Sequence, residues 1–171
     1  YGGCVINLLD TPGHKDFSED TYRVLTAVDS VIMVIDAAKG IEERTRKLFE
    51  ICRLRGIPIF TFMNKMDRPA QDPLTLVDEL EKVLGIGAFP VTWPVGNGET
   101  FRGVYDRREH RLHLYGRAAR GRHRAPDRVS GIHDDAFKSL LQPAEYAAWV
   151  EEVEMLAGAG ESFDARDVLS G

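Results

Sequence analysis

The run Asp10-Thr11-Pro12-Gly13-His14 is the first group of residues whose types and spacing can carry out chemistry. It directly follows an apolar segment, which would place it at the carboxyl end of a strand. There, a carboxylate at Asp10 can hold a Mg²⁺ ion through water, and the main-chain N–H of Gly13 can approach a phosphate closely. A neutral imidazole at His14 can orient an attacking water molecule. The same run also suits an ordinary strand-to-helix turn, with Asp10 as the helix cap.

A second group, Asn64-Lys65-Met66-Asp67, also follows an apolar run. The carboxylate of Asp67 can accept hydrogen bonds from the N1–H and the exocyclic amine of guanine. Adenine lacks this donor pair and would leave the carboxylate unpaired. Asn64 can bond to the base edge, while the stem of Lys65 can lie over the ring. Alone, this run could be a polar turn, but the two groups together, in this order, favour a guanine-nucleotide site.

These groups need a sheet to bring them together, and the first half of the sequence predicts one. Three short apolar runs, residues 4–9, 30–35 and 58–63, suit strands that are buried on both faces of a parallel sheet. Residues 16–28 and 41–55, which lie between them, have helical spacing. This order predicts a doubly wound α/β sheet, in which ligands bind at the carboxyl ends of the strands.

The second half of the sequence has a different character. A helix is predicted over residues 73–84, where apolar residues recur at helical spacing. Short strands are predicted over residues 90–95, 101–105 and 111–115. A final helix is predicted over residues 143–156, because a proline suits its first turn and a glycine follows its end.

A stretch rich in arginine and histidine covers residues 107–128. Its arginines could neutralise the phosphates of an RNA. We favour a solvated edge insertion or hairpin, because only Tyr115 is available there for base stacking. Trp93 and Trp149 are predicted to be packing residues.

The composition is that of a soluble globular protein, with 43% hydrophobic and 29% charged residues. The net charge of −5 argues against a globally basic nucleic-acid binder. No apolar run approaches the roughly 20 residues needed to span a bilayer, and no signal-peptide pattern is visible. We therefore expect a cytoplasmic monomer with no membrane attachment. Cys4 and Cys52 lie in apolar segments and are expected to be reduced thiols in the core.

With both motifs in view, the sequence resembles the translational GTPases. The phrases FSEDTYR and VTWPVGNGETFRGVY are more similar to members that act in translation termination than to elongation factor G. By this resemblance, Asp10 would hold Mg²⁺ through water, Gly13 would contact the γ-phosphate and His14 would be the catalytic residue that positions the hydrolytic water. Residues 16–28 would form the mobile switch helix. The nucleotide-binding residues would be Asp10, Thr11, Pro12, Gly13, His14, Asn64, Lys65, Met66 and Asp67.

The resemblance has departures. The family's phosphate loop, Gly-x-x-x-x-Gly-Lys-Ser/Thr, does not occur in these residues, nor do the threonine-bearing first switch and the later serine-alanine loop. We therefore expect a P-loop-NTPase-like, mostly parallel sheet with flanking helices from which the phosphate-loop strand is absent, plus a small β-containing insertion and a C-terminal helix. Residues 1–89 would be a partial GTPase core and residues 90–171 the rest of the GTP-binding domain. Because Tyr1 lies so close to a predicted strand, we expect a piece of a longer protein.

The function implied by the resemblance is ribosome-dependent GTP hydrolysis, with GTP, GDP and Mg²⁺ as ligands. The partners would be the ribosome and the stop-codon-reading release factors, which the protein would remove after peptide release. This piece alone is expected to bind GTP weakly or not at all, and to be inactive. Two alternatives stay open: translocation or ribosome protection of the elongation factor G type, and a non-catalytic truncated remnant. Asp67 argues against a Walker-type ATPase.

Overall fold

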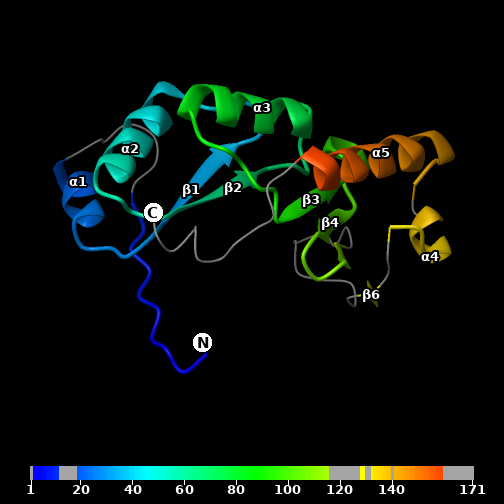
Figure 1. Ribbon diagram of the computed structural model, residues 1–171, viewed down its shortest axis with the longest axis horizontal. Coiled ribbons are helices and arrows are strands. Elements are labelled where there is room, and N and C mark those ends of the chain that lie inside the picture. Colours follow the sequence, from blue (N-terminus) through cyan, green and yellow to red (C-terminus); the bar gives the residue numbers. More distant parts are fainter. Residues whose placement is uncertain (1, 12–18, 116–127, 130–131, 140, 160–171) are drawn as a thin grey trace.

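The computed structural model describes residues 2–11, 19–115, 128–129, 132–139 and 141–159 (Figure 1). The first half of the chain contains α1 (Glu19–Leu25), β1 (Val31–Asp36), α2 (Glu43–Leu54), β2 (Ile59–Asn64) and α3 (Pro73–Leu84). The second half contains β3 (Thr92–Val95), the short 3₁₀ helix η1 (Gly98–Thr100), β4 (Gly103–Asp106), β5 (Arg111–Leu114), β6 (Arg128–Val129), α4 (Asp135–Lys138) and α5 (Pro143–Ala159). The fold is therefore mixed α/β, with its strands in two separate sheets.

Strands β1 and β2 form a parallel pair that α2 connects. Met33 and Ile35 point to one face of this pair, where they pack against Phe49 of α2 and Leu80 of α3. Figure 1 shows α2 and α3 together on one side of the two strands. The predicted strands over residues 30–35 and 58–63 and their parallel arrangement are confirmed.

The opposite face of the parallel pair carries Ile32, Val34, Phe60 and Phe62, whose side chains are between 48% and 62% exposed. Strands of this composition are typical of sheets covered on both faces. In the described part of the chain, helices cover only one of the two faces.

The predicted strand over residues 4–9 is wrong. These residues have no regular secondary structure, and large apolar side chains such as Val5 and Leu8 are exposed. An apolar run indicates a preference for burial, but a strand also needs a neighbouring strand for its main-chain hydrogen bonds. Among the described residues, none supplies that neighbour. The prediction that Cys4 is a core thiol fails for the same reason, whereas Cys52 is buried as predicted.

Helix α3 has the bounds predicted for it, because local signals mark both ends. The carboxylate of Asp72 accepts a hydrogen bond from the main-chain N–H of Thr75 at 3.0 Å, and Pro73 occupies the first turn. At the other end, Gly85 adopts a φ of 66° and donates its N–H to the carbonyl of Glu81. Only glycine adopts this left-handed conformation at little cost, so the helix ends there.

The other helices agree with their predicted positions to within a few residues. Helix α2 lies inside the predicted range 41–55, and α5 begins at Pro143 as expected and continues to Ala159. Helix α1 covers Glu19–Leu25 of the predicted range 16–28; residues 16–18 lie outside the described residues. No helix among the described residues has the length and apolar character needed to cross a membrane.

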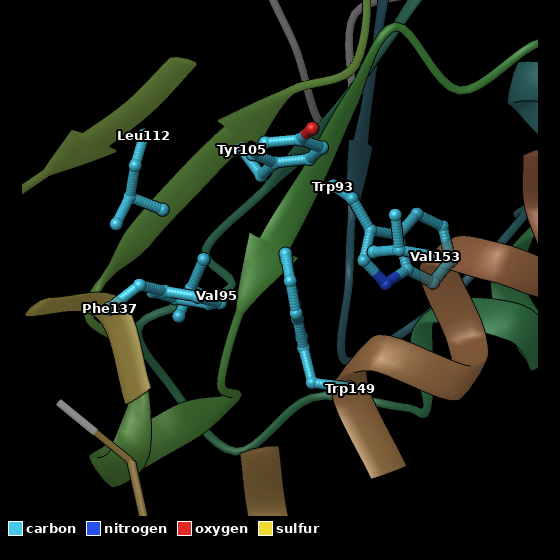
Figure 2. Packing of buried hydrophobic residues seen from close by; sticks show 7 residues of the cluster. All are labelled: Trp93, Val95, Tyr105, Leu112, Phe137, Trp149 and Val153. Atoms are coloured by element: carbon cyan, nitrogen blue, oxygen red, sulfur yellow. The ribbon is translucent and has the colours of Figure 1, made fainter. Parts of the chain in front are cut away.

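The second sheet is antiparallel, in the order β3-β4-β5-β6. Its inner face and helix α5 enclose a cluster of seven buried residues, shown in Figure 2: Trp93, Val95, Tyr105, Leu112, Phe137, Trp149 and Val153. Trp149 meets Phe137 edge to face, with ring centroids 4.7 Å apart, and its indole N–H donates to the carbonyl of Pro94 at 2.7 Å. Both tryptophans are therefore packing residues, as predicted.

The start of the basic stretch has a structural role. Arg107 donates to the carbonyl of Pro90 at 2.6 Å and to that of Leu156 near the end of α5 at 2.8 Å, and its guanidinium lies over the ring of Phe89. It therefore joins the antiparallel sheet to α5, so the side chain of Arg107 has a packing role. Residues 116–127 of the stretch lie outside the described residues.

Removing a side chain from the aromatic cluster is expected to destabilise the fold. Leu112 is 3% exposed, so Leu112→Ala should lower the free energy of unfolding by about 2–5 kcal/mol, since it leaves a cavity beside the aromatic rings. Leu54→Ala, at a position 86% exposed, is the matched control and should change it by less than about 0.5 kcal/mol. Urea unfolding followed by the fluorescence of Trp93 and Trp149 measures both. Equal effects would contradict the assigned core.

Glu152 makes the stability of this half depend on pH. Its carboxylate accepts the indole N–H of Trp93 at 2.9 Å, and burial raises the pKa of the carboxyl above its usual range. The folded chain therefore holds a proton more tightly than the unfolded chain. Stability should fall as the pH rises from the usual pKa of glutamate through the raised one. Glu152→Gln keeps an acceptor for Trp93 and carries no charge, so it should raise the urea midpoint at neutral pH.

The gain from Glu152→Gln should disappear at a pH below the usual pKa of glutamate, where the wild-type carboxyl is protonated in both states. Glu151→Gln, on the exposed side of α5, is the control and should show no such pH-dependent gain. A gain that persists unchanged at acidic pH would show that the effect is unrelated to ionisation.

Candidate functional site

The carboxyl ends of β1 and β2 lie side by side. In the register of the pair, Asp36 is the partner of Asn64, the residue that opens the run Asn64-Lys65-Met66-Asp67. The main-chain N–H of Ala37 donates to the carbonyl of Asn64 at 2.9 Å, so the pairing continues into the turns beyond the strands. The expected meeting of two strand ends is therefore present.

The turn after β2 has an uncommon backbone at Lys65, whose φ is 67°. A residue with a side chain adopts this left-handed conformation at a cost, so other contacts must hold it there. One of them is local: the side-chain oxygen of Asn64 accepts the main-chain N–H of Lys65 at 2.9 Å. Another closes the turn, because the N–H of Arg68 donates to the carbonyl of Lys65 at 3.0 Å.

The side chain of Lys65 forms an ion pair with Asp36. The ammonium nitrogen lies 2.6 Å from one carboxylate oxygen of Asp36, while the other oxygen accepts the main-chain N–H of Ala38 at 3.0 Å. The hydrogen bond from Lys65 and that from Ala38 lower the pKa of the Asp36 carboxyl. The end of β1 is thus tied to the turn after β2 through side chains as well as main chain.

Met66 and Asp67, neighbours in the turn, differ in burial. Met66 is buried in a small cluster with Ala37 and Leu76, and its carbonyl accepts the N–H of Gly98 at 2.9 Å. Asp67 is exposed. Burial of Met66 therefore anchors the turn to the body of the protein and leaves the carboxylate of Asp67 facing outward, where it can accept hydrogen bonds from a ligand.

The first motif is only partly described. Asp10 is exposed and Thr11 is partly buried, while Pro12, Gly13 and His14 lie outside the described residues. In Figure 1, the N-terminal segment runs away from the arrowheads of β1 and β2. The N-terminal segment therefore lies away from the carboxyl ends of the two strands. This follows from the failed strand over residues 4–9, which was expected to carry Asp10 to the same edge of the sheet.

Comparison with known proteins places the chain in a family. Residues 1–165 match the profile of the elongation factor Tu GTP binding domain. The chain belongs to this family. Its α/β architecture with parallel strands, and the polar turn at their carboxyl ends, are those expected of such a GTP-binding domain.

Several relatives that are similar to this chain over most of its length carry the name peptide chain release factor 3. Over all 171 residues the chain is 58% identical to a peptide chain release factor 3 of Gloeobacter violaceus, and 51% identical to that of Synechococcus elongatus. Over 164 residues it is 52% identical to that of Symbiobacterium thermophilum. The chain spans 31–32% of the length of these three relatives. The predicted resemblance to the termination members of the translational GTPases is confirmed.

A cleft of about 200 Å³ lies elsewhere in this GTP-binding domain, between the start of α3, β3 and α5. Its lining includes three carboxylates, those of Asp72, Glu145 and Glu152. Each already has a structural partner: Asp72 caps α3, Glu145 accepts the N–H of Gln142 before α5, and Glu152 accepts from Trp93. The charges of this cleft are therefore explained by the fold.

Two contacts of the GTP-binding domain were not predicted from the sequence. The pairing of Asp36 with Lys65 depends on the register of β1 against β2, although an acid at the end of the neighbouring strand was a usable signal. The bond from Gly98 to Met66 joins residues from the two halves of the chain, and no local pattern indicates it.

The ion pair predicts the titration of Asp36. The hydrogen bond from Lys65 holds the pKa of Asp36 below its usual value of 3.8. The carboxyl group of Asp36 should therefore titrate at lower pH than that of an exposed aspartate. The contribution of the pair to stability is present at neutral pH and is lost as the pH falls through this lowered pKa. NMR titration of the side-chain carboxyl measures it. In Lys65→Met, the midpoint should return towards 3.8; an unchanged midpoint would contradict the ion pair.

Proposed function

We propose that this chain is the guanine-recognising part of a GTP-hydrolysing translation factor. The turn over residues 64–67 carries the proposal, because it combines a fixed backbone with an exposed carboxylate at the carboxyl end of a parallel strand. Such an edge is where α/β sheets bind ligands. The family match to a GTP binding domain supports the same assignment.

Guanine would be selected by the number of hydrogen bonds it satisfies. Asp67 would accept the N1–H and the exocyclic amine of the base, and a base without these donors would leave a carboxylate desolvated and unpaired. Asn64 would bond to the base edge, while the aliphatic stem of Lys65 would cover the ring. Met66 would contribute to guanine recognition indirectly, because its burial beneath the turn fixes the position of Asp67.

Hydrolysis would depend on residues 10–14. Asp10 is an exposed carboxylate, a hard oxygen donor that fits the holding of Mg²⁺ through water, and the ion would neutralise charge on the phosphates. Gly13 would contact the γ-phosphate, and His14 would orient the attacking water. Thr11 and Pro12 would complete the loop, and residues 16–28 would act as the switch helix that responds to the γ-phosphate.

We further propose that the whole protein is a cytoplasmic, monomeric factor that acts on the ribosome after peptide release and removes the stop-codon-reading release factors. The relatives named peptide chain release factor 3 support this role. Residues 1–89 would be the GTPase core and residues 90–171 the remainder of the domain. The 171 residues by themselves would be inactive, because they contain no Gly-x-x-x-x-Gly-Lys-Ser/Thr loop to bind the β-phosphate.

A change of base specificity tests this function. In the full-length product of the gene that encodes this chain, Asp67→Asn should lower the affinity for GDP by about 100-fold or more, since one guanine donor loses its acceptor. The same variant should gain affinity for xanthosine diphosphate, whose base carries a carbonyl in place of the amine. Equilibrium titration with fluorescent nucleotides measures both constants.

The same variant tests the role in termination. Wild-type protein should accelerate dissociation of the release factor from ribosomes with GTP, whereas Asp67→Asn should do so only with xanthosine triphosphate. Asp78→Asn, an exposed aspartate on α3, is the control and should behave as wild type. Unchanged base preference in Asp67→Asn would refute guanine recognition by this turn. If the variant changed its base preference to xanthine but no protein accelerated release-factor dissociation, only the role in termination would be refuted, and guanine recognition by this turn would stand.

A further inference from the structure

We propose that Asp36 is a positioning residue for guanine recognition: its carboxylate holds Lys65, and through Lys65 it holds the turn that presents Asp67. The inference rests on the proposed function, because it deepens the account of the same turn. Asp36 belongs to neither sequence motif, since it ends the strand β1 and not β2.

Asp36 is itself well fixed. As the last residue of β1 it is in register with Asn64, and its main-chain carbonyl accepts the N–H groups of Lys39 and Gly40, each at 2.9 Å. One of its carboxylate oxygens accepts the N–H of Ala38 at 3.0 Å. These contacts orient the carboxylate, so the second oxygen meets Lys65 at 2.6 Å from a defined position.

Lys65 needs such an anchor. Its φ of 67° is unfavourable for a residue with a side chain, and the local hydrogen bond from its N–H to Asn64 involves an exposed side chain. The ion pair adds a long-range contact, between residues 29 positions apart in the chain, at a site where Asp36 is 19% and Lys65 is 39% exposed. Partial burial reduces screening by water and salt, so this pair should contribute more than a surface pair.

The pair also determines where the stem of Lys65 lies. With its ammonium group held at the end of β1, the aliphatic part of the side chain is confined to the space between the two strand ends. A lysine free to sample its rotamers would have to be ordered by the nucleotide, which costs affinity. The pair therefore pre-organises both the backbone of the turn and the side chain proposed to cover the base.

Helix α3 offers a matched control pair. Lys82 and Asp78 also meet at 2.6 Å, but their side chains are 73% and 57% exposed, and they lie one turn apart on the helix surface. The chemistry and the distance are the same as for Lys65 and Asp36, and only the location differs. If removing the aspartate charge changes GDP affinity at one pair and not at the other, the cause is therefore the location of the pair in the fold.

A double-mutant cycle on the full-length protein tests the inference, with the dissociation constant for GDP as the readout. Asp36→Asn removes the charge but keeps an acceptor for Ala38, and it should weaken GDP binding about fivefold to tenfold. In Lys65→Met, the partner charge is absent. Asp36→Asn should therefore have no further effect in that background, which a general structural role of Asp36 would not predict.

Three further measurements make the outcome decisive. Asp78→Asn should leave the constant unchanged, and Asp36→Glu, which keeps the charge, should lose less affinity than Asp36→Asn. Asp36→Asn should lower the unfolding temperature somewhat more than Asp78→Asn, because its pair is less exposed, and it should stay fully folded at the temperature of the binding assay. Wild-type affinity in Asp36→Asn, additive effects in the cycle, or loss of the folded state of Asp36→Asn at the assay temperature, which would show a general structural role, would each overturn the inference. If Asp67→Asn also failed to switch base preference, the proposed function would fail; a normal switch would confine the failure to Asp36.

Discussion

Helix α3 is the element on which the rest of the fold depends, because it contributes to all three hydrophobic clusters. Leu80 and Leu84 pack under the parallel pair, Leu76 packs against Met66 beneath the polar turn, and Leu74 and Val77 reach the aromatic cluster of the antiparallel half. A helix can serve three clusters only if its rotation and its starting point are both fixed. Asp72 and Pro73 fix that starting point, so a short local signal determines how the two halves meet.

The parts of the fold that could be predicted are those with local causes. The bounds of α3 follow from residues within one turn of its ends, and the strands at residues 31–36 and 59–64 follow from short apolar runs next to helices that bury them. The strand expected over residues 4–9 has the same apolar signal and still fails. Apolar character expresses a preference for burial, whereas strand formation also requires a partner for the main chain, and that requirement cannot be read from the run itself.

The candidate site likewise contains features that local sequence predicts and features that depend on long-range contacts. The position of Asn64 and Asp67 at the end of a strand was predictable, because an apolar run followed by polar residues marks that edge of a sheet. The pairing of Asp36 with Lys65 was not, since it requires the relative register of two strands and a left-handed backbone at a lysine. Approach of the Asp10 motif to this edge was expected from the order of elements, and the described residues do not show it.

The hydrogen bond from Gly98 to Met66 connects the antiparallel half directly to the turn after β2. Asn97 adds a second link, from its side-chain amide to the carbonyl of Gln71, just beyond the turn. Residues that follow the first strand of the antiparallel sheet therefore support the turn proposed to read the base. This half is not an appended module that could be exchanged or deleted at its boundary: a graft from a relative would have to preserve the geometry of Asn97 and Gly98, or it would alter nucleotide selection at a distance.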